Sequence, residues 1–135
     1  MTDPLLAQYA VLSERGMHFG RLFWQSIAFH FVMLLGAAAV FRDLQGSALG
    51  DALILAGLAT LLMAFVAWRV WVTEKKYEAL LTAIEDTLKS QGATAIQSSP
   101  PSDRRGARFA VSVSVGILGA VLIAFGFSAL MVQAG

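Results

Sequence analysis

The chain contains no cysteine, only two histidines and only three prolines in 135 residues. The absence of cysteine excludes disulfides, thiolate metal sites and a thiol nucleophile, and two histidines leave any metal site to be built from carboxylates. Charge is also scarce, because 14% of the residues are charged, where a soluble domain has about a quarter, and 57% are apolar. The net charge of +1 gives the chain no attraction to nucleic acid. This composition is typical of a membrane protein.

Three long apolar runs stand out in the sequence. Residues 22–41, 52–72 and 109–132 each supply about 20 mainly apolar residues, enough for a helix to cross roughly 30 Å of hydrocarbon. A signal peptide is the alternative for the first run, whose small residues Ala37 to Ala39 resemble a cleavage site. That run is longer than a signal core of ~7–15 residues, which favours a retained helix. We therefore predict an all-α membrane protein with three transmembrane helices.

The N-terminal segment, residues 1–20, has the pattern of a short amphipathic helix lying on the membrane surface. Its apolar face is formed by Leu5, Tyr9 and Leu12. Gly16 and Gly20 are expected to loosen the chain before the first span. Between the first two spans, Gly46 and Gly50 are expected to form a tight turn, with Asp51 capping the next helix.

The second span is expected to continue beyond the bilayer as one rod, because no helix-breaking residue lies between Gly57 and Gln91. This amphipathic extension, residues 73–91, carries a narrow apolar stripe that needs a cover. We call it the docking stripe; its members are Tyr77, Leu81, Ile84 and Leu88. The opposite face is charged and comprises Lys75, Glu78, Glu85, Asp86 and Lys89. Residues 92–107, rich in serine, proline and arginine, are predicted to be a flexible linker.

The distribution of basic residues predicts the orientation. Nine of the ten lie on the side that three spans assign to the N-terminus, and Arg42 alone lies on the other. Basic residues in short loops stay in the cytoplasm, which predicts a cytoplasmic N-terminus, a C-terminus outside and a bacterial inner-membrane location. Aromatic and basic residues near the inner ends of the first two spans are expected to be interfacial anchors, namely Trp24, Trp68, Arg69 and Trp71.

His30 is the one deep polar residue that invites a functional hypothesis, because polar groups at mid-membrane depth are costly. It either forms a hydrogen bond to Ser26 or a neighbouring helix, contacts a partner subunit, or serves as a haem ligand or proton relay. A haem would need a second protein, since His18 and His30 are twelve residues apart, or ~18 Å along a helix. Ser26 and Gln25 could also meet a lipid headgroup or a quinone beside Trp24.

Small residues recur every four positions in the second and third spans and predict helix contacts, within one chain or between chains. They are Ala56, Thr60 and Ala64, then Ser112, Gly116, Ala120 and Ala124. The basic groups Lys75-Lys76 and Arg104-Arg105-Arg108 either enforce topology or attract anionic lipid. No nucleophile stands with a base, and neither a phosphate loop nor metal-ligand spacing is present. We expect no catalytic, cofactor or metal site and no enzyme activity.

The pattern over residues 15–90 resembles that of small bacterial SLATT-type membrane proteins. It combines Arg21-Leu22-Phe23-Trp24-Gln25 at the start of a span, a second span close behind, and Lys75-Lys76-Tyr77-Glu78 opening an amphipathic helix. The resemblance implies paired transmembrane helices with a cytoplasmic extension, and a pore-forming or membrane-perturbing role in defence. A third span departs from that two-helix plan. The expected function is non-enzymatic helix packing, as a homo-oligomer or as an accessory subunit with other membrane subunits; the alternative is a SLATT-like or holin-like pore.

Overall fold

The computed structural model describes residues 3–92 and 106–134, which form three helices: α1 (Asp3–Phe41), α2 (Ser47–Ser90) and α3 (Ala107–Ala134). All three are long and apolar enough to cross a membrane. The prediction of an all-α protein with three helices of membrane-spanning length is therefore confirmed. Most of the predicted linker, residues 93–105, lies outside the described residues.

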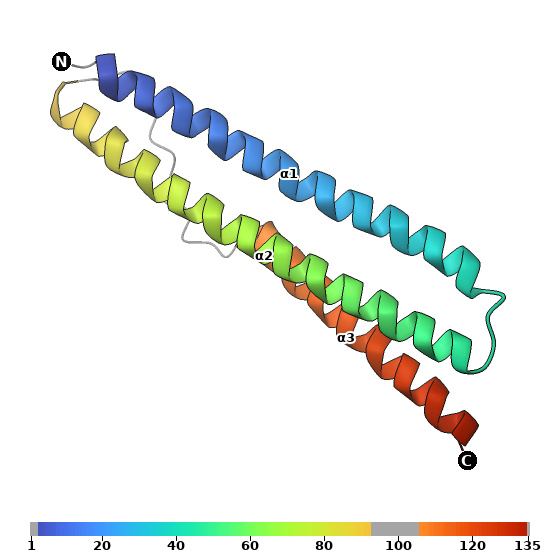
Figure 1. Cartoon of the computed structure of the whole chain (residues 1–135). Helices are drawn as coiled ribbons and strands as arrows, with labels where there is room; N and C mark the ends of the chain where they lie inside the picture. The colour runs from blue at the N-terminus through green and yellow to red at the C-terminus, as the bar shows by residue number, and fades with distance from the viewer. Residues whose placement is uncertain (1–2, 93–105, 135) are drawn as a thin grey trace.

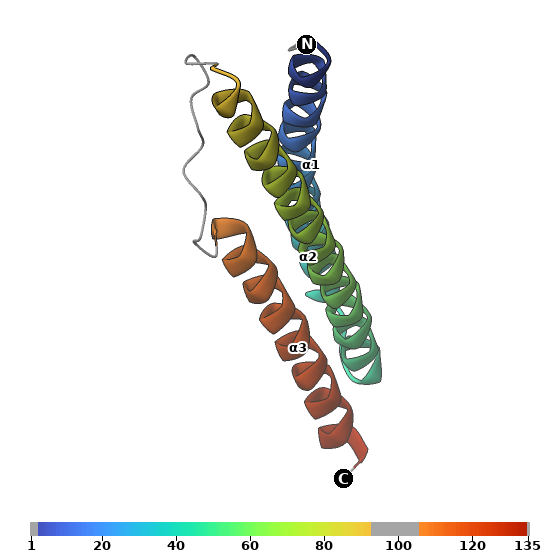
Figure 2. The same ribbon diagram turned by 90° about the vertical axis from the view of Figure 1, so that its left-hand side faces the viewer.

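Helix α2 is the central element of the fold. Helices α1 and α2 form a long antiparallel hairpin, and α3 packs on α2 from another side, as Figures 1 and 2 show. Side chains of all three helices meet in one buried cluster near the N-terminal end of α3, formed by Phe23, Ile27, Ala67 and Val115. Because α1 and α3 are both held by α2, the packing along α2 determines the arrangement of the other two helices.

Helix α1 differs from the prediction of a separate interfacial helix. It runs without a break through Gly16 and Gly20 for 39 residues, or roughly 58 Å. One face of α1 is buried or half-buried along its whole length, at three- and four-residue spacing: Leu5, Tyr9, Leu12, Gly16, Phe19, Phe23, Ile27, His30 and Leu34. A single continuous contact with α2 keeps the two glycines helical, so the predicted break is absent.

The turn between α1 and α2 is shorter than expected. Gly46 alone supplies the left-handed conformation, with φ of 71°, and α2 begins at the next residue, Ser47. Gly50 and Asp51, predicted as a turn residue and a cap, both lie inside α2. Gly50 is helical because it packs against α3, as described below. From Ser47, α2 continues for 44 residues, roughly 66 Å, as one rod.

The docking stripe is covered within the chain itself. The N-terminal half of α1 packs along it, and we call residues 3–21 of α1 with residues 73–90 of α2 the polar hairpin. Phe19 stacks on Tyr77 with ring centroids 5.4 Å apart, and Leu88 is fully buried. Glu85, predicted on the charged outer face, is 3% exposed and accepts a 3.1 Å hydrogen bond from the Tyr9 hydroxyl. The two amphipathic faces predicted from the sequence thus cover each other.

Leu88→Ala is expected to loosen the polar hairpin, because removing a buried leucine side chain costs about 2–5 kcal/mol. Leu80→Ala is the matched control on the same helix segment, since Leu80 is 53% exposed. Hydrogen–deuterium exchange of the first four turns of α1, in detergent micelles, measures the effect. We expect exchange at least roughly 30-fold faster in the Leu88 variant, the equivalent of about 2 kcal/mol. Equal exchange in both variants would contradict this packing.

Candidate functional site

A polar junction lies where the three helices meet, at the end of α3 that begins with Ala107. Arg108 of α3 forms an ion pair with Glu74 of α2. Its guanidinium carbon lies 5.9 Å from the centre of the Phe23 ring of α1, and Gly20 of α1 leaves room beside it. A Cβ atom at Gly20 would stand only 2.8 Å from the Arg108 guanidinium. Arg108 thus contacts both α1 and α2.

The junction is more than a surface ion pair. The side chain of Glu74 is 10% exposed and that of Arg108 is 28% exposed, so both charges have lost much of their water. Removing one partner of a buried pair leaves an uncompensated charge, which is strongly unfavourable. The Lys75–Glu78 pair, with a 3.8 Å separation and half-exposed side chains, has no such constraint. Arg108 was assigned from the sequence to a basic loop cluster, and Glu74 was not singled out at all.

His30 forms its polar contact inside the chain. Its Nε2 atom lies 3.1 Å from the Thr60 hydroxyl oxygen of α2. The Thr60 hydroxyl donates to the Ala56 carbonyl at 2.7 Å, so its oxygen accepts a hydrogen bond from His30 Nε2–H. Thr60 is fully buried. Among the alternatives predicted for His30, the structure therefore shows a hydrogen bond to a neighbouring helix. Ser26 is half-buried one turn earlier on α1.

Removing the His30–Thr60 contact is expected to have a moderate effect. Hydrogen bonds between membrane helices average about 0.6 kcal/mol and reach about 1.7. In a double-mutant cycle of His30→Phe and Thr60→Val, we expect a coupling energy in this range, measured by steric-trap unfolding in bicelles. Zero coupling would mean that the two side chains do not interact in the membrane.

The α2–α3 contact is a glycine seam, formed by Gly50 and Gly57 of α2 with Gly119 and Gly126 of α3. A Cβ atom added at Gly57 would lie 2.7 Å from the Gly119 carbonyl oxygen, and one at Gly126 would lie 2.8 Å from the Gly50 carbonyl oxygen. No side chain fits between these backbones. Because lipid provides no hydrophobic driving force between helices, membrane helices associate through close backbone approach at small residues.

The seam repeats every seven residues and differs from the predicted four-residue stripes. Gly116 opposes Ala64 in ordinary contact, since a Cβ added at Gly116 would lie 3.7 Å from that of Ala64, and Ser112 is buried. Thr60 faces His30 of α1 and Ala56 is half-buried. Ala120 and Ala124 lie on the exposed side of α3 and take no part in the seam. The signal that locates the seam is the heptad spacing of its glycines.

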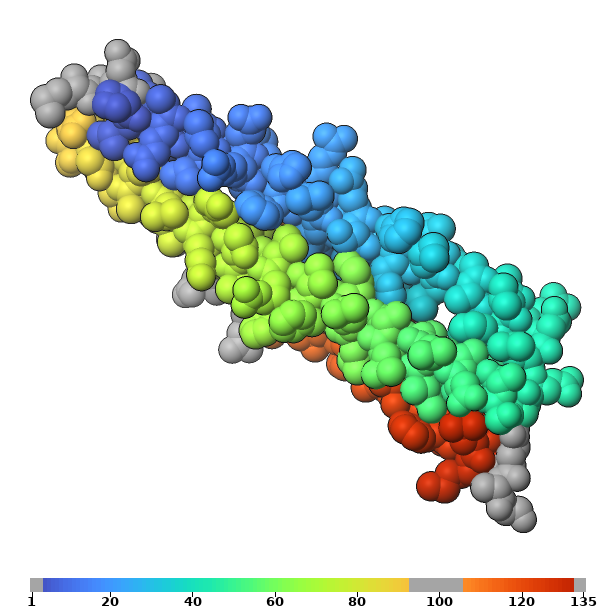
Figure 3. Space-filling model, viewed as in Figure 1, coloured from blue at the N-terminus to red at the C-terminus, as the bar shows by residue number. Residues whose placement is uncertain are grey.

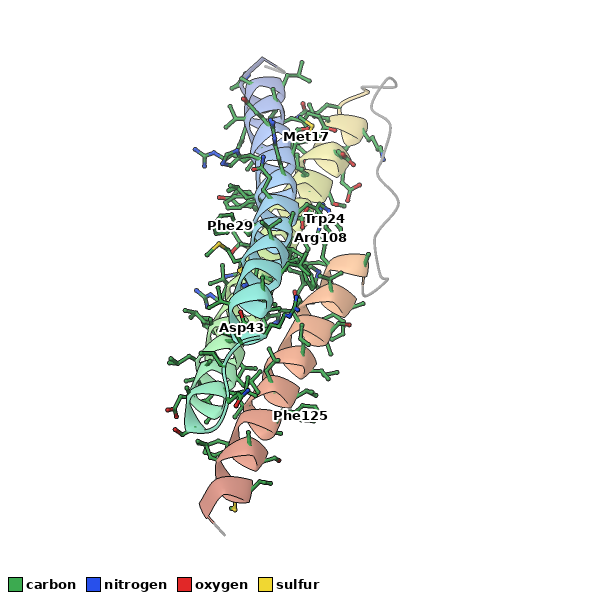
Figure 4. All side chains as sticks on the ribbon, turned by 90° about the vertical axis from the view of Figure 1, so that its right-hand side faces the viewer. Met17, Trp24, Phe29, Asp43, Arg108 and Phe125 are labelled. Carbon is green, nitrogen blue, oxygen red and sulfur yellow. The ribbon has the colours of Figure 1, made fainter. Side chains whose placement is uncertain are left out.

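The predicted interfacial anchors lie near the polar junction. Trp24 is 47% exposed and Trp68 46% exposed. Arg69 is exposed as well, whereas Trp71 is half-buried and packs on Phe109 of α3, with ring centroids 5.4 Å apart. Figure 4 shows Trp24 and Arg108 close together, with Met17, Phe29 and Phe125 on outer surfaces.

Hollows lie between α1 and α3 over the surface of α2. Two of them, of about 480 and 350 Å³, surround the polar junction and share Trp24, Glu74 and Arg108. A third, of about 410 Å³, begins at Trp24 and is almost wholly apolar. A fourth, of about 460 Å³, shares Phe31 and Leu118 with the third and ends near the turn. Figure 3 shows an opening between α1 and α2 in that region.

The described part of the chain holds no group of three or more metal-ligating side chains. Polar side chains from different helices meet in an ion pair, Glu74–Arg108, and in two hydrogen-bonded pairs, Tyr9–Glu85 and His30–Thr60. Burial, then the hydrogen bond to Glu85 and its negative charge, raises the pKa of Tyr9. All three pairs connect one helix to another, so the role that these polar side chains support is helix packing.

No protein-family model, curated protein or solved structure matches the chain.

Proposed function

We propose that the chain is a non-enzymatic, multi-pass protein of the bacterial inner membrane that acts through helix packing. In this proposal it is a subunit of an assembly, made either of copies of itself or of other membrane subunits. The polar hairpin and the N-terminus lie in the cytoplasm and the C-terminus lies outside, because nine of ten basic residues flank the N-terminal side.

The observation that carries the proposal is a small-residue face on α3 that residues 3–92 and 106–134 leave uncovered. Ala120, Ala124 and Ser128 follow one another at four-residue spacing, and all three are exposed. The Ser128 hydroxyl donates to the Ala124 carbonyl, so the face presents no unsatisfied donor. Faces of this kind let helix backbones approach closely in lipid. The glycine seam brings backbones together in the same way on the opposite side of α3, where α3 packs against α2.

The alternative, a SLATT-like or holin-like pore, has less support. In such a pore, several copies of the chain would line a path with the polar side chains of their spans, His30, Ser26 and Thr60. Thr60 is fully buried, so its side chain is not available to line a path between copies. His30 forms its hydrogen bond to Thr60 within the chain. We therefore favour an assembly subunit over a pore.

Native mass spectrometry of particles prepared directly from bacterial membranes tests the proposal. We expect the wild-type chain to appear with further copies or with a second membrane protein. Ala124→Ile is expected to reduce this association by blocking close approach, whereas Ala59→Ile, at an exposed position on α2, should not. A strictly monomeric wild-type chain without any co-purifying protein would overturn the proposal.

A further inference from the structure

We propose that the groove between α1 and α3 is a binding site for an anionic glycerophospholipid, with the headgroup at the polar junction and an acyl chain over α2. This site is independent of self-association, because it lies on a different side of α3 from Ala120 and Ala124. The groove residues of α3 are Val111, Ser114, Val115, Leu118 and Leu122.

The groove has two parts with the polarity of an amphiphile. Its mouth is the pair of hollows around Glu74 and Arg108, which also expose Arg21 and Lys75. Its trough is the pair of apolar hollows below, with Ile27, Phe31 and Leu118 among their lining residues. Trp24 lines the mouth and the top of the trough, so it marks the boundary between them. Tryptophan prefers this depth, at the level of lipid headgroups.

The dimensions of the trough fit a lipid chain. From Trp24 to Phe41, α1 advances seventeen residues, or roughly 26 Å, most of a ~30 Å hydrocarbon core. The trough is therefore longer than one leaflet, about half of that core, and has room for an acyl chain. Both hollows of the trough are open along the helices rather than enclosed, which gives a lipid chain lateral access.

The charge at the mouth favours an anionic headgroup. Arg108 pairs with Glu74 and Lys75 pairs with Glu78, while Arg21 has no ion-pair partner among the described residues. The mouth thus has three basic and two acidic side chains, a net charge of one positive unit. Basic pockets between transmembrane helices are known to favour anionic headgroups.

Quenching of Trp24 fluorescence by brominated lipids tests the site. Trp68→Phe and Trp71→Phe leave Trp24 as the only tryptophan. The protein is placed in phosphatidylcholine vesicles with a minor fraction of brominated phosphatidylglycerol, or of brominated phosphatidylethanolamine as the zwitterionic comparison. We expect the anionic lipid to be preferred about fivefold, the selectivity that one basic residue near the surface provides. Equal quenching by the two lipids overturns the proposal.

Two further variants separate the headgroup and chain contacts. Arg21→Gln should abolish the preference for phosphatidylglycerol, while Arg15→Gln, at an exposed position of α1 outside the mouth, should preserve it. Ser114→Phe fills the trough and should reduce quenching by phosphatidylglycerol, whereas Val113→Phe, on the outer side of α3, should not. Selectivity that survives Arg21→Gln, or quenching unaffected by Ser114→Phe, contradicts the site. A monomeric chain that still shows the full pattern leaves the lipid site supported and the proposed assembly refuted.

Discussion

Gly57→Leu is expected to separate α3 from α2 and to be among the most destabilising single substitutions in the chain. A Cβ atom at this position would lie 2.7 Å from the Gly119 carbonyl oxygen and 3.0 Å from the Ile123 backbone nitrogen. Because these are backbone atoms, no side-chain rotation relieves the clash. Overpacking of this kind costs about 1–3 kcal/mol, and we expect the upper end. Steric-trap unfolding in bicelles measures the change in the free energy of unfolding.

Gly36→Leu is the matched control for this substitution. Gly36 also lies inside a membrane-spanning helix, but a Cβ atom there meets nothing within 4 Å. Its effect should stay within about 0.5 kcal/mol, as for other substitutions at open positions. If both glycine variants destabilise the chain equally, the loss comes from helix or lipid effects and the seam is not the cause.

Arg108→Leu is expected to release α3 and α1 from the polar junction. The substitution leaves the Glu74 carboxylate, 10% exposed, without its counter-charge. Breaking a buried pair from one side costs about 3–5 kcal/mol; we expect about 3 kcal/mol because 28% of the Arg108 side chain remains accessible to solvent. The free energy of unfolding in bicelles again provides the measurement. Lys76→Gln, which removes an exposed charge from the same turn of α2, should have little effect.

The double variant Glu74→Leu with Arg108→Leu separates the cost of an orphaned charge from the value of the pair. Replacing both partners of a buried pair with apolar residues is often neutral. We therefore expect the double variant to recover most of the stability lost in Arg108→Leu. Additive losses in the double variant would show that the two side chains act independently, contrary to the junction.

The helices themselves could be predicted from the sequence because hydrophobic length depends only on local composition. The continuity of α1 could have been predicted too. Leu5, Tyr9, Leu12, Phe19 and Phe23 keep one helical period from the charged segment into the apolar one. The prediction of a break at Gly16 and Gly20 was therefore wrong, because the same apolar face continues through both glycines. Helix propensity is a weak guide where tertiary packing holds glycine in a helix.

The contacts between helices were harder to predict, because they depend on which faces meet. Arg108 and Glu74 are 34 positions apart in sequence, and neither residue type in isolation indicates a junction. Glu85 was predicted to lie on a charged outer face, yet it is buried and accepts a hydrogen bond from the half-buried Tyr9 of α1. The four-residue stripes and the heptad glycines of α3 overlap in sequence. The heptad spacing marks these glycines in the sequence, and the register against α2 determines that they form the seam while the alanines remain exposed.

Cysteine cross-linking in native membranes tests most directly the central claim, that α2 and α3 of one chain form the glycine seam and that assembly uses other faces. The chain has no cysteine, so Ala64→Cys with Gly116→Cys introduces a single pair. Their Cβ atoms would lie 3.7 Å apart, close to the ~3.8 Å of a disulfide. We predict rapid oxidation to an intrachain disulfide, seen as a monomer with altered mobility on a non-reducing gel. Disulfide-linked dimers from coexpressed single-cysteine variants, without the intrachain product in the double variant, would contradict the account.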